Sequence, residues 1–243
     1  MATLRPTHAI VESQGKSSPI PTTRRYPCLQ HPPKQSPISS SPTPRWCAMP
    51  LPSSGTRRMT SCSITHAAFS CFGALQGIRR GLQPDLELLY VGAMFHDIGL
   101  TDRYRTSALR FEVDGANAAR EFLLDRGADE GDARKVWLSI ALHTTPNVPE
   151  FLEPEIALVT AGVETDVLGI GRDDLPPDAL EVVTAAHPRP DFKRRILQAF
   201  TDGMKHRPEA TFGTVNADVL EHFDPSFVRD DFVDIILKNS WPE

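Results

Sequence analysis

From about residue 72 to the C-terminus, apolar residues recur at helical spacing in one segment after another. In "DEGDARKVWLSIALHTTP" (129–146) they stand at positions 133, 136, 137, 140 and 141, on one face of an α-helix. The same pattern is found in residues 84–99, 114–127, 153–169, 176–188, 191–208 and 229–240. No segment alternates apolar and polar residues over a convincing length, and no Asn-Gly pair marks a hairpin. The sequence therefore predicts an all-α fold.

Residues that favour the start or the end of a helix support the assignment of these segments as helices. Pro84 suits the first turn of its helix and Gly99 suits its C-cap, while Asp114 is an N-cap candidate for the next segment. Pro146 stops the segment that begins at residue 129. There is no internal repeat, so we expect one helical domain over residues 61–243.

Residues 1–60 have a different composition. Eleven of the 22 prolines lie between Pro6 and Pro52, among Ser, Thr and Gln. Such a segment buries too little apolar area to offset its ordering entropy, and we expect it to be disordered. Two other interpretations stay open. One is an organelle transit peptide, although the prolines disfavour an amphipathic helix; the other is that the segment is not the native reading frame.

The distribution of charged residues and of cysteines limits which partners and which cellular compartment are expected. Residues 1–60 hold eight Lys/Arg and one acid, whereas residues 61–243 hold 18 Lys/Arg and 30 acids. Because phosphate binding needs clustered cations, the acidic body disfavours a nucleic-acid partner. No run approaches the ~18 apolar residues that a membrane span needs. The four cysteines have no C-x-x-C spacing, which favours a reducing, cytoplasmic location.

The segment "VGAMFHDIGLT" (91–101) places His96 and Asp97 directly after an apolar run, where a buried polar pair must be bonded or ligated. His143 and Asp166 also stand near the C-terminal ends of apolar helices. Imidazole and carboxylate together suit zinc, iron, manganese or nickel. A shared metal site is therefore one interpretation of these four residues.

Each of these residues also has a structural interpretation. His143 alone would be favoured by the helix macrodipole, and Asp166 alone would be an acid in a last turn or a cap. Glu112 and Asp114 would be a loop residue and an N-cap. The structural interpretation is weakest for Asp97, because an acid in the last turn opposes the macrodipole.

Four segments, in their order and spacing, resemble the HD-domain superfamily of metal-dependent phosphohydrolases. They are "LYVGAMFHDIGLT", "RFEVDGANAAREFL", "SIALHTT" and "LVTAGVETDVLG". The resemblance covers roughly residues 72–240 and is greatest to the branch that contains cyanamide hydratase. It implies an HD-domain helical bundle with a metal held by His96, Asp97 and Asp166. It also implies that His143 lies at the site, as a ligand of a second metal or a substrate contact.

The superfamily's first metal-binding histidine is expected in a His-Ser-x-Arg helix, where this chain has "SITHAAFSCFGALQG". His66 is one residue from the expected register, which is a rotation of about 100° on a helix. We therefore expect His66 to face solvent, although it stays a further candidate ligand. Read one nucleotide earlier, the codons permit His at the Thr65 position, followed by Ser and Arg. Residues 1–70 would then be in a shifted frame.

The leading functional expectation is a metal-dependent hydrolase or hydratase that acts on a small molecule through a metal-activated water. Asp97 would ligate the metal, with zinc as the first choice, and orient the water, while His143 would be the general acid/base. By the resemblance, Phe111 and Glu112 would line the substrate pocket. Two alternatives stay open: a phosphohydrolase, and a degenerate, inactive HD module without its first histidine. No membrane partner is expected, and a homo-oligomer stays open.

Overall fold

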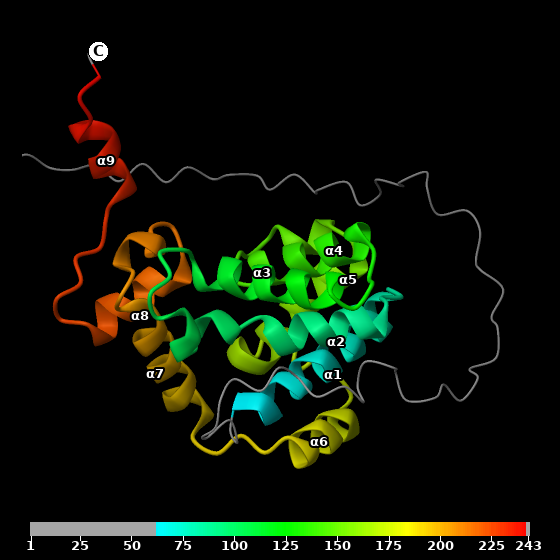
Figure 1. The fold of residues 1–243 in the computed structure, drawn as a ribbon. Coiled ribbons are helices and arrows are strands. Elements are labelled where there is room, and N and C mark those ends of the chain that lie inside the picture. Colours follow the sequence, from blue (N-terminus) through cyan, green and yellow to red (C-terminus); the bar gives the residue numbers. More distant parts are fainter. Residues whose placement is uncertain (1–61, 242–243) are drawn as a thin grey trace, which may run out of the picture. The chain divides into compact units, whose positions relative to one another are not determined.

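The computed structural model describes residues 62–241, with side chains from residue 66 onward. This part of the chain is helical and contains no strand, which confirms the all-α expectation for it (Figure 1). Residues 1–60, for which disorder was expected, lie outside the described residues. The α-helices are α1 (Cys62–Arg80), α2 (Leu86–Phe95), α3 (Phe111–Leu124), α4 (Glu130–Ala141), α5 (Pro154–Val163), α6 (Pro177–Ala186), α7 (Phe192–Met204), α8 (Val215–Phe223) and α9 (Phe232–Lys238). No helix in this range is long and apolar enough to cross a membrane.

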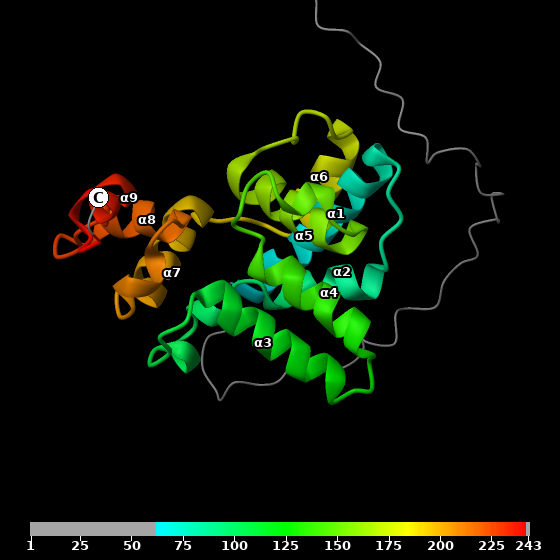
Figure 2. The ribbon, with the colours of Figure 1, turned by 90° about the horizontal axis from the view of Figure 1, so that it is seen from above.

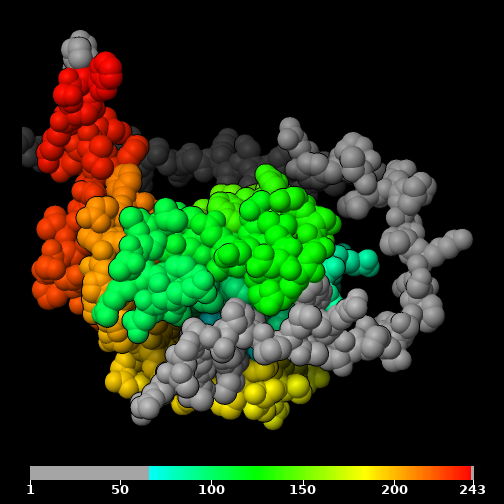
Figure 3. All heavy atoms as spheres, in the orientation of Figure 1, coloured from blue at the N-terminus to red at the C-terminus, as the bar shows by residue number. Residues whose placement is uncertain are grey.

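Helix α2 lies at the centre of the core. It begins after Asp85, whose side chain accepts hydrogen bonds from the backbone N–H groups of Glu87 and Leu88. It packs against α1, α3, α4 and α5. Helices α3 and α4 cover it on the near face of the molecule in Figure 3. Seven of its ten residues are buried, so it shows no polar face. The turn that follows α2 is therefore carried into the interior.

Helices α1 and α5 approach each other closely. A Cβ at Gly162 would lie 2.3 Å from the Phe69 carbonyl oxygen, so only glycine fits there. A Cβ at Gly73 would likewise lie 2.6 Å from the Leu158 carbonyl oxygen. This close contact fixes the face of α1 that turns toward the core.

The C-terminal helices form a second layer beside the turn after α2. Figures 1 and 2 both show α7 and α8 side by side, joined to α6 by an extended segment. Phe111, Met204 and Leu220 pack together and join α3, α7 and α8. Every residue of α9 is exposed.

Three local expectations need correction. Asp114 is not an N-cap: α3 begins at Phe111, and Asp114 pairs with Arg207. Gly99 is not the C-cap of α2, which ends at Phe95; it lies in the short 3-10 helix Ile98–Leu100. Glycine is needed there because a Cβ would lie 2.1 Å from the Phe111 carbonyl oxygen. Pro84 is not in the first turn of α2, because Asp85 is the N-cap and the helix begins at Leu86. In addition, helix α8 was not predicted.

Candidate metal centre

The turn after α2 directs His96 and Asp97 toward the same buried space. The two residues are 1% and 6% exposed. Asp97 has φ −102° and ψ 3°, close to the bridge region where many active-site residues lie. His96 Nε2 lies 3.1 Å from Asp97 Oδ2 but makes no hydrogen bond to any described residue. The two atoms are close enough to serve as neighbouring ligands of one ion.

His66 joins this pair from α1. The expectation that His66 faces solvent is wrong, because the residue is only 8% exposed. It lies one helical turn before Phe69, so the two share the face of α1 that is packed into the core. The rings of His66 and His96 have centroids 5.0 Å apart. Each of His66, His96 and Asp97 offers a ligand atom, and these atoms lie within 4.8 Å of one another. This group could hold a metal ion.

His143 approaches the other oxygen of Asp97. It follows α4 and is 3% exposed, and its Nε2 lies 3.8 Å from Asp97 Oδ1. Its ring centroid is 5.0 Å from that of His96. A surface histidine that merely complements the macrodipole of α4 would not be buried in this way. His143 therefore lies beside the group, where it contacts Asp97.

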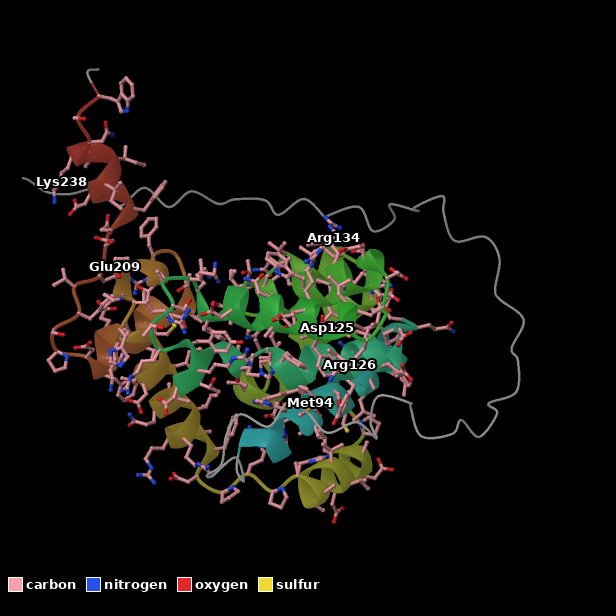
Figure 4. All side chains as sticks on the ribbon, viewed as in Figure 1. Met94, Asp125, Arg126, Arg134, Glu209 and Lys238 are labelled. Atoms are coloured by element: carbon pink, nitrogen blue, oxygen red, sulfur yellow. The ribbon has the colours of Figure 1, made fainter. Side chains whose placement is uncertain are left out.

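Backbone carbonyls fix the orientation of these rings. Nδ1 of His96 lies 2.7 Å from the Ala93 carbonyl oxygen, and Nδ1 of His143 lies 2.7 Å from that of Ile140. His66 has a hydrogen bond to the backbone of Met94, which is labelled on α2 in Figure 4. If each Nδ1 donates, Nε2 of His96 and of His143 presents its lone pair toward Asp97. Metal-binding histidines are typically oriented by such a second bond.

The pKa shifts favour the metal-binding protonation state at Asp97, His66 and His143 but not at His96. Burial, followed by the neighbouring His96, lowers the pKa of His66 to about 4. Burial and His96 likewise lower the pKa of His143. Burial raises the pKa of Asp97, but His96 and the other histidines outweigh it and hold the carboxyl pKa below its usual range. Burial lowers the pKa of His96, but the charge of Asp97 and the hydrogen bonds of the ring outweigh burial and raise this pKa above its usual value. A cation would therefore compete with a proton at His96, whereas Asp97, His66 and His143 can bind it without first losing a proton.

Asp166 lies outside this group. It stands in the π-helical turn Glu164–Leu168 that ends α5, and it is 4% exposed. Its Oδ1 lies 3.3 Å from Arg189 Nη1, and Arg189 Nη2 donates to the Asp166 main-chain oxygen at 2.6 Å. Burial raises the pKa of Asp166 to about 6, although Arg189 and His96 oppose the shift. Neither carboxylate oxygen makes a hydrogen bond to a described residue. The prediction that Asp166 ligates the metal stays a prediction.

A cavity of about 150 Å³ opens against His66 and Asp97. Its walls include Phe69, Arg189, Phe192, Arg195, Ile196 and Ala199. The predicted substrate contacts are elsewhere: Phe111 is fully buried with its ring 5.6 Å from that of His143. Glu112 accepts hydrogen bonds from Arg110 and Thr144 at 2.9 and 2.6 Å. Neither residue lines this cavity, and their contact with substrate stays a prediction.

Sequence reasoning missed three arginines near the site. Arg189 and Arg195 line the cavity, and Arg207 is buried beside the turn after α2. Arg195 could have been found from its spacing to Phe192 and Ile196 in the amphipathic segment 191–208. No comparable signal marks Arg189 or Arg207.

Comparisons with known proteins add no family to this description. No protein-family model matches the chain, and no curated protein matches it.

Proposed function

We propose that the protein is a metal-dependent hydrolase or hydratase that acts on a small molecule, with an HD-like helical bundle. The observation that carries this proposal is the buried group of His66, His96 and Asp97 beside His143. These residues fit a metal ion because an Nε2 atom without a hydrogen bond lies beside an ionised carboxylate. Nitrogen and oxygen donors favour zinc, with iron, manganese and nickel as alternatives.

Each residue of the site would then have its own role in the reaction. His66, His96 and Asp97 would hold the ion, with Asp166 as a candidate fourth ligand. When bound, the ion would polarise a water molecule and lower its pKa toward neutrality. Asp97 would accept a hydrogen bond from this water and orient it. His143, neutral at pH 7, would accept a proton at Nε2 and later donate it to the product.

The cavity supports a small substrate. A volume of about 150 Å³ lies well below the roughly 300 Å³ at which pockets for drug-sized ligands begin. For a nitrile, one water would add across the carbon–nitrogen triple bond and give an amide. A phosphate ester is the second candidate, because Arg189 and Arg195 line the cavity. The inactive-module alternative loses its main support, since His66 lies in the group after all.

Zinc titration of the purified, chelator-treated chain tests the proposal. We expect one equivalent to bind, and we expect His66→Ala and His96→Ala to weaken binding by more than ~100-fold. Even residues that only support a ligand typically contribute roughly 10- to 100-fold. His222→Ala is the matched control, because His222 is exposed on α8. Unchanged affinity in both site variants would contradict the proposal. A substrate panel of nitriles and phosphate esters then separates the two candidate reactions.

A further inference from the structure

One face of α7 forms a wall of the cavity beside the metal group. Phe192, Arg195, Ile196 and Ala199 stand at positions i, i+3, i+4 and i+7, so they share that face. Together with Phe69 they make a wall that is mostly apolar and carries one guanidinium. The neighbouring Arg194 does not line the cavity and pairs with Asp191.

The two arginines of the cavity differ in their partners. Arg189 is bound to Asp166 through its side-chain and main-chain oxygens, and its guanidinium lies 4.3 Å from the centre of the Phe192 ring. No ion pair joins Arg195 to any residue that the structure describes. Asp97 is the one carboxylate among the described lining residues, and His96 and His143 face its two oxygens. Arg195 is therefore the cation in this cavity that is available to a ligand.

We propose that the cavity binds a small molecule with one carboxylate and a short apolar body, and that Arg195 recognises the carboxylate. This proposal rests on the proposed function and names the substrate class of the same site. A guanidinium matches a carboxylate through two parallel N–H···O bonds. The apolar side chains of Phe69, Phe192 and Ile196 would cover the remainder of the molecule.

The volume of the cavity and the charges in its lining favour a small molecule with a single carboxylate. A cavity of roughly 150 Å³ can hold a molecule about the size of benzene, which favours a small ligand over a nucleotide. A phosphate group carries a charge of about −1.5 to −2 and three strongly accepting oxygens, so it needs several donors. The lining offers one guanidinium that is not already paired, which suits a monoanion better.

Calorimetric titration of the full chain with butyrate, butyramide and inorganic phosphate, with and without one equivalent of zinc, tests the proposal. We expect butyrate to bind at least about tenfold more tightly than the neutral butyramide, because a hydrogen bond to a charged group is worth that much. Arg195→Gln should remove this advantage and leave butyramide unchanged. Arg194→Gln is the matched control and should change neither affinity.

Four results would overturn the proposal. The first two are equal affinity for butyrate and butyramide, and tighter binding of phosphate than of butyrate. The third is an equal loss of butyrate affinity in Arg194→Gln and Arg195→Gln. The fourth is an unchanged butyrate affinity in Arg195→Gln, whether zinc is present or absent. Zinc affinity is measured separately, so a chain that binds butyrate through Arg195 but binds no zinc would refute the proposed function alone.

Discussion

The turns that follow α2 and α5 each contain a buried carboxylate, and each is held by an arginine that donates to a main-chain carbonyl. After α2, Arg207 donates to the carbonyl oxygen of Gly99 at 2.6 Å, and it pairs with Asp114 on α3. Asp114 lies outside the metal group. The charge of Arg207 is thus balanced without using Asp97, whose two oxygens face histidines.

After α5 the arrangement is different. Arg189 donates to the main-chain oxygen of Asp166 and also lies beside the carboxylate of the same residue. The carboxylate that neutralises the charge of Arg189 is therefore that of Asp166, the residue that the resemblance to the HD-domain superfamily assigns to the metal. The counterion of the supporting arginine thus decides which buried carboxylate is available to a cation.

The largest effect is expected at the first turn. Arg207 is 3% exposed and donates to the carbonyl oxygens of Gly99, Gly203 and Leu109 as well as to Asp114. Arg207→Met would leave a buried carboxylate without its counterion, and we expect the free energy of unfolding to fall by about 3–5 kcal/mol. Urea denaturation measures the change. The control Arg194→Met removes a fully exposed pair and should leave the free energy of unfolding nearly unchanged. A loss of similar size in both variants would contradict the comparison.

The second prediction concerns the charge of Asp166 in the metal-free protein. Its folded pKa of about 6 lies above the ordinary value of 3.8. The folded state therefore binds the proton more tightly than the unfolded state does, and stability falls as the pH rises from about 4 to 6. Because one pKa unit corresponds to about 1.4 kcal/mol, the loss contributed by Asp166 should be about 2–3 kcal/mol.

Asp166→Asn isolates this contribution. His66 has a lowered pKa and acts with the opposite sign, because the unfolded state then gains a proton as the pH falls below about 6.5. Only the difference between the wild type and Asp166→Asn removes this second effect. Thermal or urea unfolding of both chelator-treated proteins at pH 4 and pH 7 provides the measurement. A difference that stays constant across this range would show that Asp166 titrates as an ordinary carboxyl.

The helices and part of the site could be predicted from the sequence because their signals are local. The period of apolar residues gave the segments of α2 to α5, and polar residues after apolar helices drew attention to His96, Asp97 and His143. The predicted orientation of His66 was wrong because it was based on the position at which the HD-domain superfamily has its first histidine. The buried face of α1, which Phe69 and Phe72 mark, would have placed it correctly.

The counterions could not be predicted, because they depend on which loops meet in space. Arg189 is 23 residues from Asp166, and Arg207 is 93 residues from Asp114. A carbonyl such as that of Gly99 needs an outside donor only because its turn leaves the helix, and the sequence does not specify which side chain reaches it.

The third prediction concerns a further support of the second turn. The buried Gln76 on α1 donates from Nε2 to Thr165 Oγ1 at 3.0 Å and to the carbonyl oxygen of Gly171 at 2.9 Å. Gln76→Ala would leave buried acceptors without a donor, and we expect a loss of about 1–3 kcal/mol in the free energy of unfolding. Gln83→Ala, at an exposed position before α2, should change it by less than ~0.5 kcal/mol. Equal effects of the two substitutions would mean that the π-helical turn does not depend on α1.

The smallest effect is expected for Arg189→Gln, and it tests the comparison most directly. Burial raises the pKa of Asp166 and Arg189 lowers it, so removal of the guanidinium should move this pKa further above 6. The free energy of unfolding at pH 7 should change by no more than ~1 kcal/mol, because the Arg189 side chain is 29% exposed and its pairing is partly screened. A carbon-detected NMR titration of the Asp166 carboxyl in the metal-free protein follows the pKa itself. Arg172→Gln, at an exposed position in the next loop, serves as the control and should leave the pKa in place. An unchanged pKa in Arg189→Gln would mean that the arginine acts only on the main chain of the turn, and that the Asp166 carboxylate is as available to a cation as that of Asp97.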